Sequence, residues 1–445
     1  MAREPASSFW KWLAPGMGVK RWVALMLAGV IVASLGLAVV IDARILGGLE
    51  SWLFGAIIGF LLIVAGAAAG IGGFQLFLRS VMTAVLGAGD AARIADIVYQ
   101  RRQLNRGPRV VALGGGTGLS TLLRGLKGYT SNITAIVTVA DDGGSSGRLR
   151  TELGVLPPGD IRNCLAALAD TEPLMESLFQ YRFRAGEGLR GHSFGNLFIA
   201  AMTGVTGDFE RAVRESSKVL AVRGEVLPAT SSLVTLLAEL EDGSTVRGET
   251  GVTRAGRAIR RVFMDPQDAE PTTAALDAIQ KADLIVLGPG SLFTSIVPNL
   301  LVRGMAESIA RSAAPVVYVC NVMTQPGETD SFSASQHVEA VLDYLGPARA
   351  ALDYVIINEK QPVPEELLAR YRAQGAAPVA ADTAKITALG CSVISADVAS
   401  YHDVARHDPG RLAAVIVGLV GPARGRGWVL ARLFKRSRGH DRGIL

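Results

Sequence analysis

The sequence predicts an α/β protein with a mostly parallel, doubly wound sheet, preceded by a hairpin of two transmembrane helices. Two uncharged apolar runs, residues 23–41 and 53–78, predict the two helices. Beyond residue 108, short apolar patterns typical of buried strands alternate with helical patterns, which indicates one parallel sheet. Glycine-rich loops follow several of these strands, in the position where such sheets bind ligands.

The composition of the 445-residue chain agrees with this fold class and excludes others. Hydrophobic residues make up 49% of the chain, so it is not intrinsically disordered. The three cysteines, Cys164, Cys320 and Cys391, are too few for a disulfide scaffold and form no zinc-binding pattern. By length alone, about three structural units are expected.

Each apolar run reaches the roughly 20 residues that a helix needs to cross a bilayer. The segment between the runs holds a single basic residue, Arg44, whereas both outer flanks are basic. The positive-inside rule therefore predicts a multi-pass anchor in the inner or plasma membrane, with both ends and the main domain in the cytoplasm. A cleaved signal peptide is the alternative, and the second run argues against it. The small residues of 65–73 suit close helix packing or dimerisation, or they fill a lipid-facing helix.

These features divide the chain into four expected parts. They are a membrane anchor (1–78), a basic juxtamembrane linker (79–107), a main domain (108–421) and a basic tail (422–445). The tail either rests on a membrane surface or is solvated. Residues 110–421 carry a net charge of −7, so the basic ends account for the positive charge of the whole chain. An acidic body disfavours a nucleic-acid-binding groove.

Apolar patterns assign the elements of the main domain in order. Strands are expected at 109–113, 133–139, 284–287, 316–320 and 354–357, and helices at 119–126, 157–169, 197–202 and 209–220. The section 233–261 is richer in β-branched residues, glycine and charge, which predicts the short strands of a β insertion.

The first candidate binding loop joins a strand to a helix and consists of Gly114, Gly115, Gly116, Thr117 and Gly118. Glycines let the backbone approach a phosphate, and the helix N-terminus supplies free N–H donors. The loop is neither a G-x-G-x-x-G fingerprint nor a P-loop. A tight turn without a ligand is the alternative.

The second candidate loop follows the strand 133–139 and contains Asp141, Asp142 and Ser145. Two adjacent carboxylates there could hold a divalent cation, bind a ribose hydroxyl or accept a proton from a substrate. An ordinary Asp-Gly turn is the alternative.

Further candidate ligand-binding residues lie in four other polar loops. Asp160 falls in a first helical turn, where it could also act only as a cap. His192 is expected to serve a structural or hydrogen-bonding role rather than to act as a general base. The whole set comprises Asp160, Asn163, His192, Gly195, Asn196, Gly288, Gly290, Ser291, Asn321 and Thr324. Because the carboxyl ends of parallel strands share one edge of the sheet, these loops predict one crevice for a nucleotide or a phosphorylated ligand.

Six strings of this sequence, in order, resemble the bacterial gluconeogenesis-factor (YvcK-like) proteins. They are VVALGGGTGLSTLLRGLK, TVADDGGSSGRLR, PPGDIRNCLAALAD, GHSFGNLFIAAMT, LIVLGPGSLFTSIVPNLLV and CNVMTQPGET, within residues 108–410. These proteins belong to the wider superfamily of 2-phospho-L-lactate transferases (CofD-like). The resemblance implies a Rossmann-like three-layer αβα fold that binds a nucleotide. The transmembrane hairpin and the tail depart from the commoner members.

The resemblance implies a regulatory protein that binds a UDP-sugar and affects carbon metabolism, peptidoglycan precursor supply and cell shape. The apolar runs of the sequence itself make the membrane an expected partner, and their small residues favour a second copy of the chain. Cell-wall synthesis proteins are the partners that the resemblance implies. The alternative is a 2-phospho-L-lactate transferase-like enzyme that uses a nucleotide-diphosphate carrier, with Mg²⁺ on Asp141 and Asp142 and with Asp142 as the catalytic residue. An NAD-dependent dehydrogenase is a weaker third hypothesis. It rests on the acidic residues about 20 positions after the glycine loop.

Overall fold

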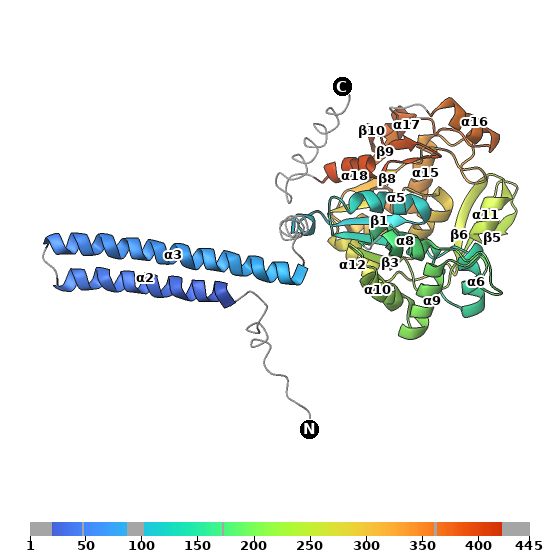
Figure 1. The fold of residues 1–445 in the computed structure, drawn as a ribbon. Helices are drawn as coiled ribbons and strands as arrows, with labels where there is room; N and C mark the ends of the chain where they lie inside the picture. Colours follow the sequence, from blue (N-terminus) through green and yellow to red (C-terminus); the bar gives the residue numbers. More distant parts are fainter. Residues whose placement is uncertain (1–19, 47–48, 87–101, 171–172, 360–362, 421–445) are drawn as a thin grey trace. The chain divides into compact units, whose positions relative to one another are not determined.

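The structure, a computed structural model, describes residues 20–46, 49–86, 102–170, 173–359 and 363–420 (Figure 1). The chain divides into two compact units, residues 1–102 and 103–445, rather than the three expected from its length. The linker residues 87–101 and the tail 421–445 lie outside the described residues, so the predictions made for them stay predictions.

The first unit is a hairpin of two long helices, α2 (Lys20–Leu46) and α3 (Leu49–Leu86). Lys20–Ile45 and Trp52–Ser80 are long and apolar enough to cross a membrane, and only 11% of each apolar window is buried. A core helix of a soluble protein would instead be mostly buried. The predicted pair of long apolar helices is thus confirmed, with ends a few residues beyond those expected.

Glycines bring the backbones of α2 and α3 into direct contact. A Cβ atom on Gly29 would lie 2.5 Å from the Gly70 nitrogen, and one on Gly36 would lie 2.6 Å from the Gly59 carbonyl oxygen. A Cβ atom on Gly66 would lie 2.5 Å from the Gly29 carbonyl oxygen. Small residues let helices in lipid approach closely and gain van der Waals contact. Gly66, in the small-residue segment 65–73, therefore allows α3 to pack closely against α2.

Replacing Gly66 by leucine is expected to separate α2 from α3, because backbone atoms of the facing helix cannot move aside for the new side chain. A disulfide between Ala43→Cys and Gly55→Cys, present in both variants, reports on the hairpin. A Cβ atom on Gly55 would lie 2.5 Å from the Ala43 Cβ atom, so a local shift of about 1 Å brings the pair to the 3.5 Å or more that a disulfide requires. We expect several-fold less disulfide in the Gly66→Leu variant on non-reducing gels. Gly72→Leu is the matched control, because a Cβ atom there meets nothing within 4 Å. Equal disulfide yields in the two variants would contradict the packing role.

The second unit is built on a seven-stranded parallel sheet of order β10-β9-β8-β7-β1-β2-β3. Its strands are β1 (Val110–Gly114), β2 (Ile133–Val137), β3 (Glu225–Pro228), β7 (Leu284–Leu287), β8 (Val316–Val319), β9 (Leu352–Asn358) and β10 (Ser392–Ala396). The central strands β1, β7 and β8 are buried along their whole length, which means that both faces of the sheet are covered. The predicted α/β fold with a mostly parallel sheet is confirmed.

Helices follow most of the strands. They are α5 (Gly116–Leu126), α6 (Gly144–Leu153), α7 (Gly159–Leu168), α8 (Pro173–Gln180), α9 (Phe194–Thr206), α10 (Phe209–Val219), α12 (Thr273–Lys281), α13 (Val297–Leu300), α14 (Met305–Arg311), α15 (Ala334–Leu345), α16 (Glu365–Ala373), α17 (Thr383–Ala388) and α18 (Pro409–Gly418). Two further helical segments are the π-helix η1 (Leu292–Ile296) and the 3₁₀ helix η2 (Gly346–Ala351).

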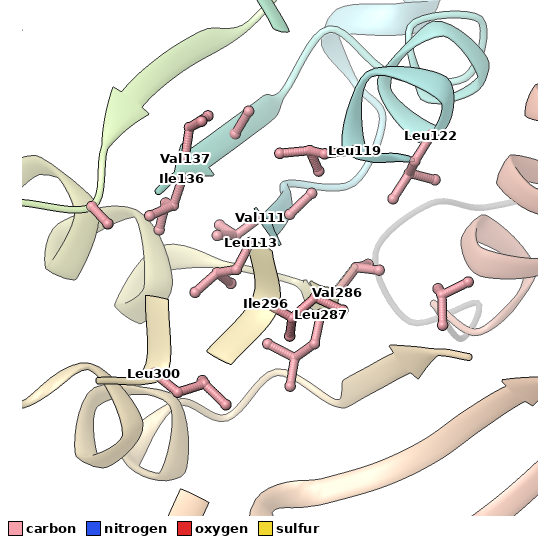
Figure 2. Packing of buried hydrophobic residues seen from close by; sticks show 14 of the residues in the cluster. Val111, Leu113, Leu119, Leu122, Ile136, Val137, Val286, Leu287, Ile296 and Leu300 are labelled. Atoms are coloured by element: carbon pink, nitrogen blue, oxygen red, sulfur yellow. The ribbon is translucent and has the colours of Figure 1, made fainter. Parts of the chain in front are cut away.

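The hydrophobic core lies between this sheet and its helices. Figure 2 shows the part around the central strands β1, β2 and β7, where aliphatic side chains from helix α5 and segment η1 interleave with those of the sheet. The labelled residues are Val111, Leu113, Leu119, Leu122, Ile136, Val137, Val286, Leu287, Ile296 and Leu300. This packing holds the ends of β1 and β7, and the loops that follow them, in one place.

Two small antiparallel sheets complete the unit. The first, of order β5-β4-β6, consists of β4 (Thr235–Leu240), β5 (Thr245–Arg247) and β6 (Ile259–Asp265), with helix α11 (Glu249–Ala255) directly after β5. It occupies the section that the sequence assigns to a β insertion. The second is the hairpin of β11 (Ala399–Tyr401) and β12 (Ala405–His407).

Candidate functional site

The strand order of the parallel sheet reverses between β1 and β7. Sequential strands run outward from β1 through β2 to β3, and then outward in the other direction from β7 to β10. In open parallel sheets, a crevice forms beyond the carboxyl ends of the strands at such a reversal point. The register pairs Leu113 of β1 with Leu287 of β7, so the glycine loops after both strands begin side by side.

The two glycine loops touch through their backbones. The Gly288 N–H donates a hydrogen bond of 2.8 Å to the Leu113 carbonyl oxygen. A Cβ atom on Gly118 would lie 2.5 Å from the Pro289 carbonyl oxygen, so no larger residue fits between the loops. Gly116 and Gly288 adopt φ angles of +61° and +83°, which L side chains rarely adopt. The loops therefore require glycine at these positions.

A cavity of about 500 Å³ opens between these loops. Nine of the residues selected from the sequence line it: Gly115, Gly116, Thr117, Gly118, Asp160, Asn163, Gly290, Ser291 and Asn321. Its other lining residues are Thr121, Glu249, Pro289, Ser295, Val322, Met323, Gln325, Ala405, Arg406 and His407. Backbone N–H groups at the start of α5 and the hydroxyls of Thr117 and Ser291 make this end of the cavity suitable for an anion.

Asp160 stands at the opening of the first glycine loop. Its carboxylate accepts a hydrogen bond from the Gly116 N–H, and a Cβ atom on Gly115 would lie 2.5 Å from its Oδ2 atom. Burial, followed by the charge of Asp141, raises the pKa of Asp160 to about 7. Although Asp160 belongs to the first turn of α7, it caps α5.

Glu249 brings a second carboxylate to the cavity from the first turn of α11. Burial raises its pKa to about 9, with further contributions from Asp141, Asp160, Glu328 and Asp142. The sequence offered no local signal for this residue, because it lies in the insertion, outside the strand ends of the main sheet. Glu249 reaches the cavity only through contacts between segments that lie far apart in the sequence.

Asp141 and Asp142 do not line the cavity. The Asp141 Oδ1 atom accepts the Gly143 N–H at 2.8 Å, which is the Asp-Gly turn that the sequence left as an alternative. The Asp142 Oδ1 atom accepts the Thr250 N–H at 2.9 Å. Asp142 therefore fixes the start of α11 and holds the insertion against the end of β2.

Magnesium on Asp141 and Asp142 stays a prediction. Each carboxylate has an oxygen committed to a backbone N–H group. Among the residues that the structure describes, no three His, Cys, Asp or Glu side chains gather in a way that could hold a metal ion.

Ser145, His192 and Asn196 form a buried network outside the cavity lining. His192 Nδ1 lies 2.9 Å from the Ser145 hydroxyl, to which the Asn196 amide also donates at 3.1 Å. Burial, followed by the charge of Arg148, lowers the pKa of His192, so its ring is neutral near pH 7. The network connects the start of α6 with the start of α9, which indicates a structural role.

Gly195, Gly114, Gly288 and Thr324 also lie outside the cavity lining. A Cβ atom on Gly195 would lie 2.6 Å from the Phe179 carbonyl oxygen, so this glycine serves packing. The Thr324 hydroxyl accepts the Ala377 N–H at 2.9 Å within a buried loop contact. A ligand-binding role for these four residues stays a prediction.

Asn299 supports the first glycine loop and was not selected from the sequence. This fully buried side chain donates hydrogen bonds to the Gly114 carbonyl oxygen at 3.2 Å and to the Ser295 carbonyl oxygen at 2.7 Å. It thus ties the end of β1 to the segment after β7. The cavity-lining Ser295, Arg406 and His407 were missed too. Ser295 belongs to η1, which directly follows the glycine loop after β7, whereas no local pattern marks the hairpin of β11 and β12 that carries Arg406 and His407.

Comparisons with known proteins agree with this architecture. Residues 110–399 match the protein family described as 2-phospho-L-lactate transferase CofD. A protein of Nostoc sp. is 50% identical over 434 residues, which cover 94% of each chain. The gluconeogenesis factor of Bacillus subtilis is 52% identical over 314 residues, or 70% of this chain and 98% of the relative. A crystal structure of a Bacillus halodurans protein has a TM-score of 0.68 at 52% identity and covers 70% of this chain and 99% of that one.

Proposed function

Because this chain belongs to the CofD family and is similar to gluconeogenesis factors within it, we propose that it is a membrane-tethered regulatory protein that binds a UDP-sugar. In this proposal, ligand binding adjusts carbon metabolism and the supply of peptidoglycan precursors, and through them cell shape. The main domain lies in the cytoplasm, close to the membrane at which cell walls are built.

One observation carries the binding proposal: the cavity of about 500 Å³ between two glycine loops at the reversal point of the sheet. The N-terminus of α5 offers N–H donors and the positive end of a helix dipole to a diphosphate. Thr117, Ser291 and Arg406 add hydroxyl donors and a positive charge to the lining. The volume falls within the roughly 300–1,000 Å³ typical of small-molecule sites.

The tether is supported by the length, apolarity and exposure of α2 and α3. Their outward faces carry large apolar side chains such as Leu27, Phe54 and Phe60, each at least 60% exposed. Exposed apolar surface on this scale is unfavourable in water and suits a bilayer. The basic flanks of the hairpin favour the orientation with both ends in the cytoplasm.

The test is isothermal titration calorimetry of the full chain in detergent micelles. UDP-glucose, UDP-N-acetylglucosamine, GDP and NAD are titrated with and without magnesium. We expect micromolar binding of the two UDP-sugars without a magnesium requirement. Binding of none of these ligands would overturn the proposal, and binding of NAD alone would favour a dehydrogenase.

A transferase is the second candidate, favoured by the family match over residues 110–399. It differs from a regulatory protein in turnover and in its use of a nucleotide-diphosphate carrier. Magnesium-dependent binding of GDP in the same titration, followed by product formation, would support it. Because Asp142 holds α11 in place, loss of activity on its substitution would not by itself identify a catalytic residue.

A further inference from the structure

Residues 174–190 form an exposed segment that comprises most of α8 and the turn after it. Within this exposed segment, only Phe179 and Phe183 are not exposed. Leu174, at 79% exposure, lies almost entirely in solvent. The large apolar side chains at its surface are Leu174, Met175, Leu178, Tyr181 and Leu189. Apolar side chains gathered on one surface segment mark an interaction site, because water solvates them unfavourably.

The exposed segment is held in place by the fold around it. The ring of Phe179 is buried and packs edge-on against the ring of Phe198, with 5.7 Å between the centroids. The Phe183 N–H donates a hydrogen bond of 2.9 Å to the His192 carbonyl oxygen, and the Gly191 N–H donates one of 2.8 Å to the Phe183 carbonyl oxygen. Because Phe179 already occupies the inward face of α8, the other apolar side chains of this helix are held facing outward.

Arginine side chains gather at the end of the exposed segment. The Arg148 Nη2 atom donates a hydrogen bond of 2.9 Å to the Arg190 carbonyl oxygen, and the Arg182 Nη1 atom donates one of 2.6 Å to the Gly191 carbonyl oxygen. The two guanidinium groups therefore lie against the same two residues, despite their like charge. Both charges also act on the next residue, His192, whose pKa is lowered by burial first and then further by Arg148 and Arg182.

The positive charge of this surface has no ion pair within the chain. The arginine cluster comprises Arg148, Arg182, Arg184 and Arg190, none of which forms an ion pair with a carboxylate among the described residues. Of the three glutamates nearby, Glu176 pairs with Arg124 at 3.9 Å. The four arginines then face only two unpaired carboxylates, those of Glu152 and Glu187. Residues 110–421 carry a net charge of −7, so this local positive excess indicates an anionic partner outside the chain.

We infer, on the basis of the proposed tether, that the exposed segment and the arginine cluster form a surface of the main domain that contacts anionic phospholipids of the bilayer. A guanidinium group suits a lipid phosphate, because its planar fork donates two hydrogen bonds to two oxygens. Leu174, Leu178 and Tyr181 enter the boundary between headgroups and acyl chains, where apolar and amphipathic side chains are stable. Because the hairpin holds the main domain at the bilayer, this contact is an intramolecular step that requires little affinity of its own.

The contact would give the main domain a defined orientation on the bilayer. Helix α7 lies directly before the exposed segment and carries Asp160 and Asn163, which line the cavity between the glycine loops. A surface fixed on lipid beside α7 therefore also fixes the direction in which the cavity opens.

Quenching of a fluorophore by spin-labelled lipids measures this contact in the full chain. The chain is reconstituted into nanodiscs of phosphatidylcholine alone or with added phosphatidylglycerol. Ala185→Cys places the fluorophore in the exposed segment, and Ala373→Cys, an exposed alanine of α16, is the matched control. The three native cysteines are buried, so labelling is selective. We expect several-fold stronger quenching at Ala185→Cys than at Ala373→Cys, and a further increase with phosphatidylglycerol.

Removing charge from the arginine cluster should weaken the contact without disturbing the fold. The side chains of Arg184 and Arg190 have no hydrogen bond or ion pair within the described ranges. Arg184→Gln combined with Arg190→Gln should reduce the quenching at Ala185→Cys by about three-fold, since each basic residue adds to the attraction of anionic lipids. Arg254→Gln combined with Arg311→Gln removes equal charge from exposed arginines elsewhere and should leave the quenching unchanged.

Three outcomes would contradict the inference, and they are distinguishable. Equal quenching at Ala185→Cys and Ala373→Cys, in chains that have entered the nanodiscs, would overturn the lipid contact and leave the proposed tether intact. Weak quenching at Ala185→Cys together with disulfide cross-links between chains in vesicles would show that the surface binds a second copy instead. A chain that does not enter the nanodiscs would overturn the tether and the lipid contact together.

Discussion

Replacing Gly118 by valine is expected to weaken UDP-sugar binding at least 100-fold while the sheet and its helices stay folded. A Cβ atom at this position would lie 2.5 Å from the Pro289 carbonyl oxygen, 2.8 Å from its carbonyl carbon and 2.9 Å from the Gly290 Cα atom. All three are backbone atoms, so no flexible side chain can move aside. The start of α5 must then move away from the loop after β7, and the N–H groups of the two loops no longer converge on one diphosphate. A 100-fold loss corresponds to about 2.8 kcal/mol.

Calorimetry with UDP-glucose measures this loss, and circular dichroism with thermal melting checks that the variant is folded. Gly204→Val is the matched control, because a Cβ atom at Gly204, on the exposed side of α9, meets nothing within 4 Å. We expect the control variant to bind as the unaltered chain does. A folded Gly118→Val variant with full affinity would show that the diphosphate does not lie between the two glycine loops.

The free energy of unfolding is expected to fall as the pH rises from about 5 to 9. Burial raises the pKa of Asp160 and of Glu328 to about 7 and that of Glu249 to about 9. Between the ordinary carboxyl pKa and these raised values, the folded state holds protons that the unfolded state has released. The stability that these three carboxyl groups contribute is therefore fully present below their ordinary pKa. It is lost as the pH rises through their raised pKa values. This direction is opposite to that of a protein stabilised by ionised carboxylates.

Glu328→Gln should flatten this fall, since Glu328 is 2% exposed and its Oε2 atom has no hydrogen-bond partner among the described residues. Its other oxygen accepts the Thr294 hydroxyl at 3.1 Å, a contact that a glutamine oxygen can also accept. One pKa unit corresponds to about 1.4 kcal/mol. Between pH 5 and 8, we therefore expect the free energy of unfolding of the variant to fall by on the order of 3 kcal/mol less than that of the unaltered chain. Urea titrations at several pH values measure the difference, with Glu307→Gln as the exposed control. Parallel curves for the two variants would show that Glu328 is ionised in the folded protein throughout this range.

The candidate site was only partly predictable from the sequence. The glycine loops were visible because a phosphate-binding turn needs glycine at adjacent positions in the chain. The roles of Asp141 and Asp142 were not, because a carboxylate after a strand can face a ligand or cap a neighbouring backbone. The Asp142 side chain accepts the N–H group of Thr250, a residue 108 positions away. No pattern within the segment around Asp142 could reveal this partner.

The sequence alone determined the two long apolar helices, the parallel sheet and the glycine turns after β1 and β7. Each of these depends on residues that are close neighbours in the chain, so apolar periodicity and glycine spacing are sufficient to predict them. Only the tertiary structure decided which side chains face the cavity. It brought Glu249 from the insertion and Arg406 from the hairpin of β11 and β12 to the loops, whereas Asp142 does not line the cavity and binds the Thr250 N–H. The physical reason is that exposure, charge and hydrogen bonding at a site are set by contacts between segments that lie far apart in the sequence.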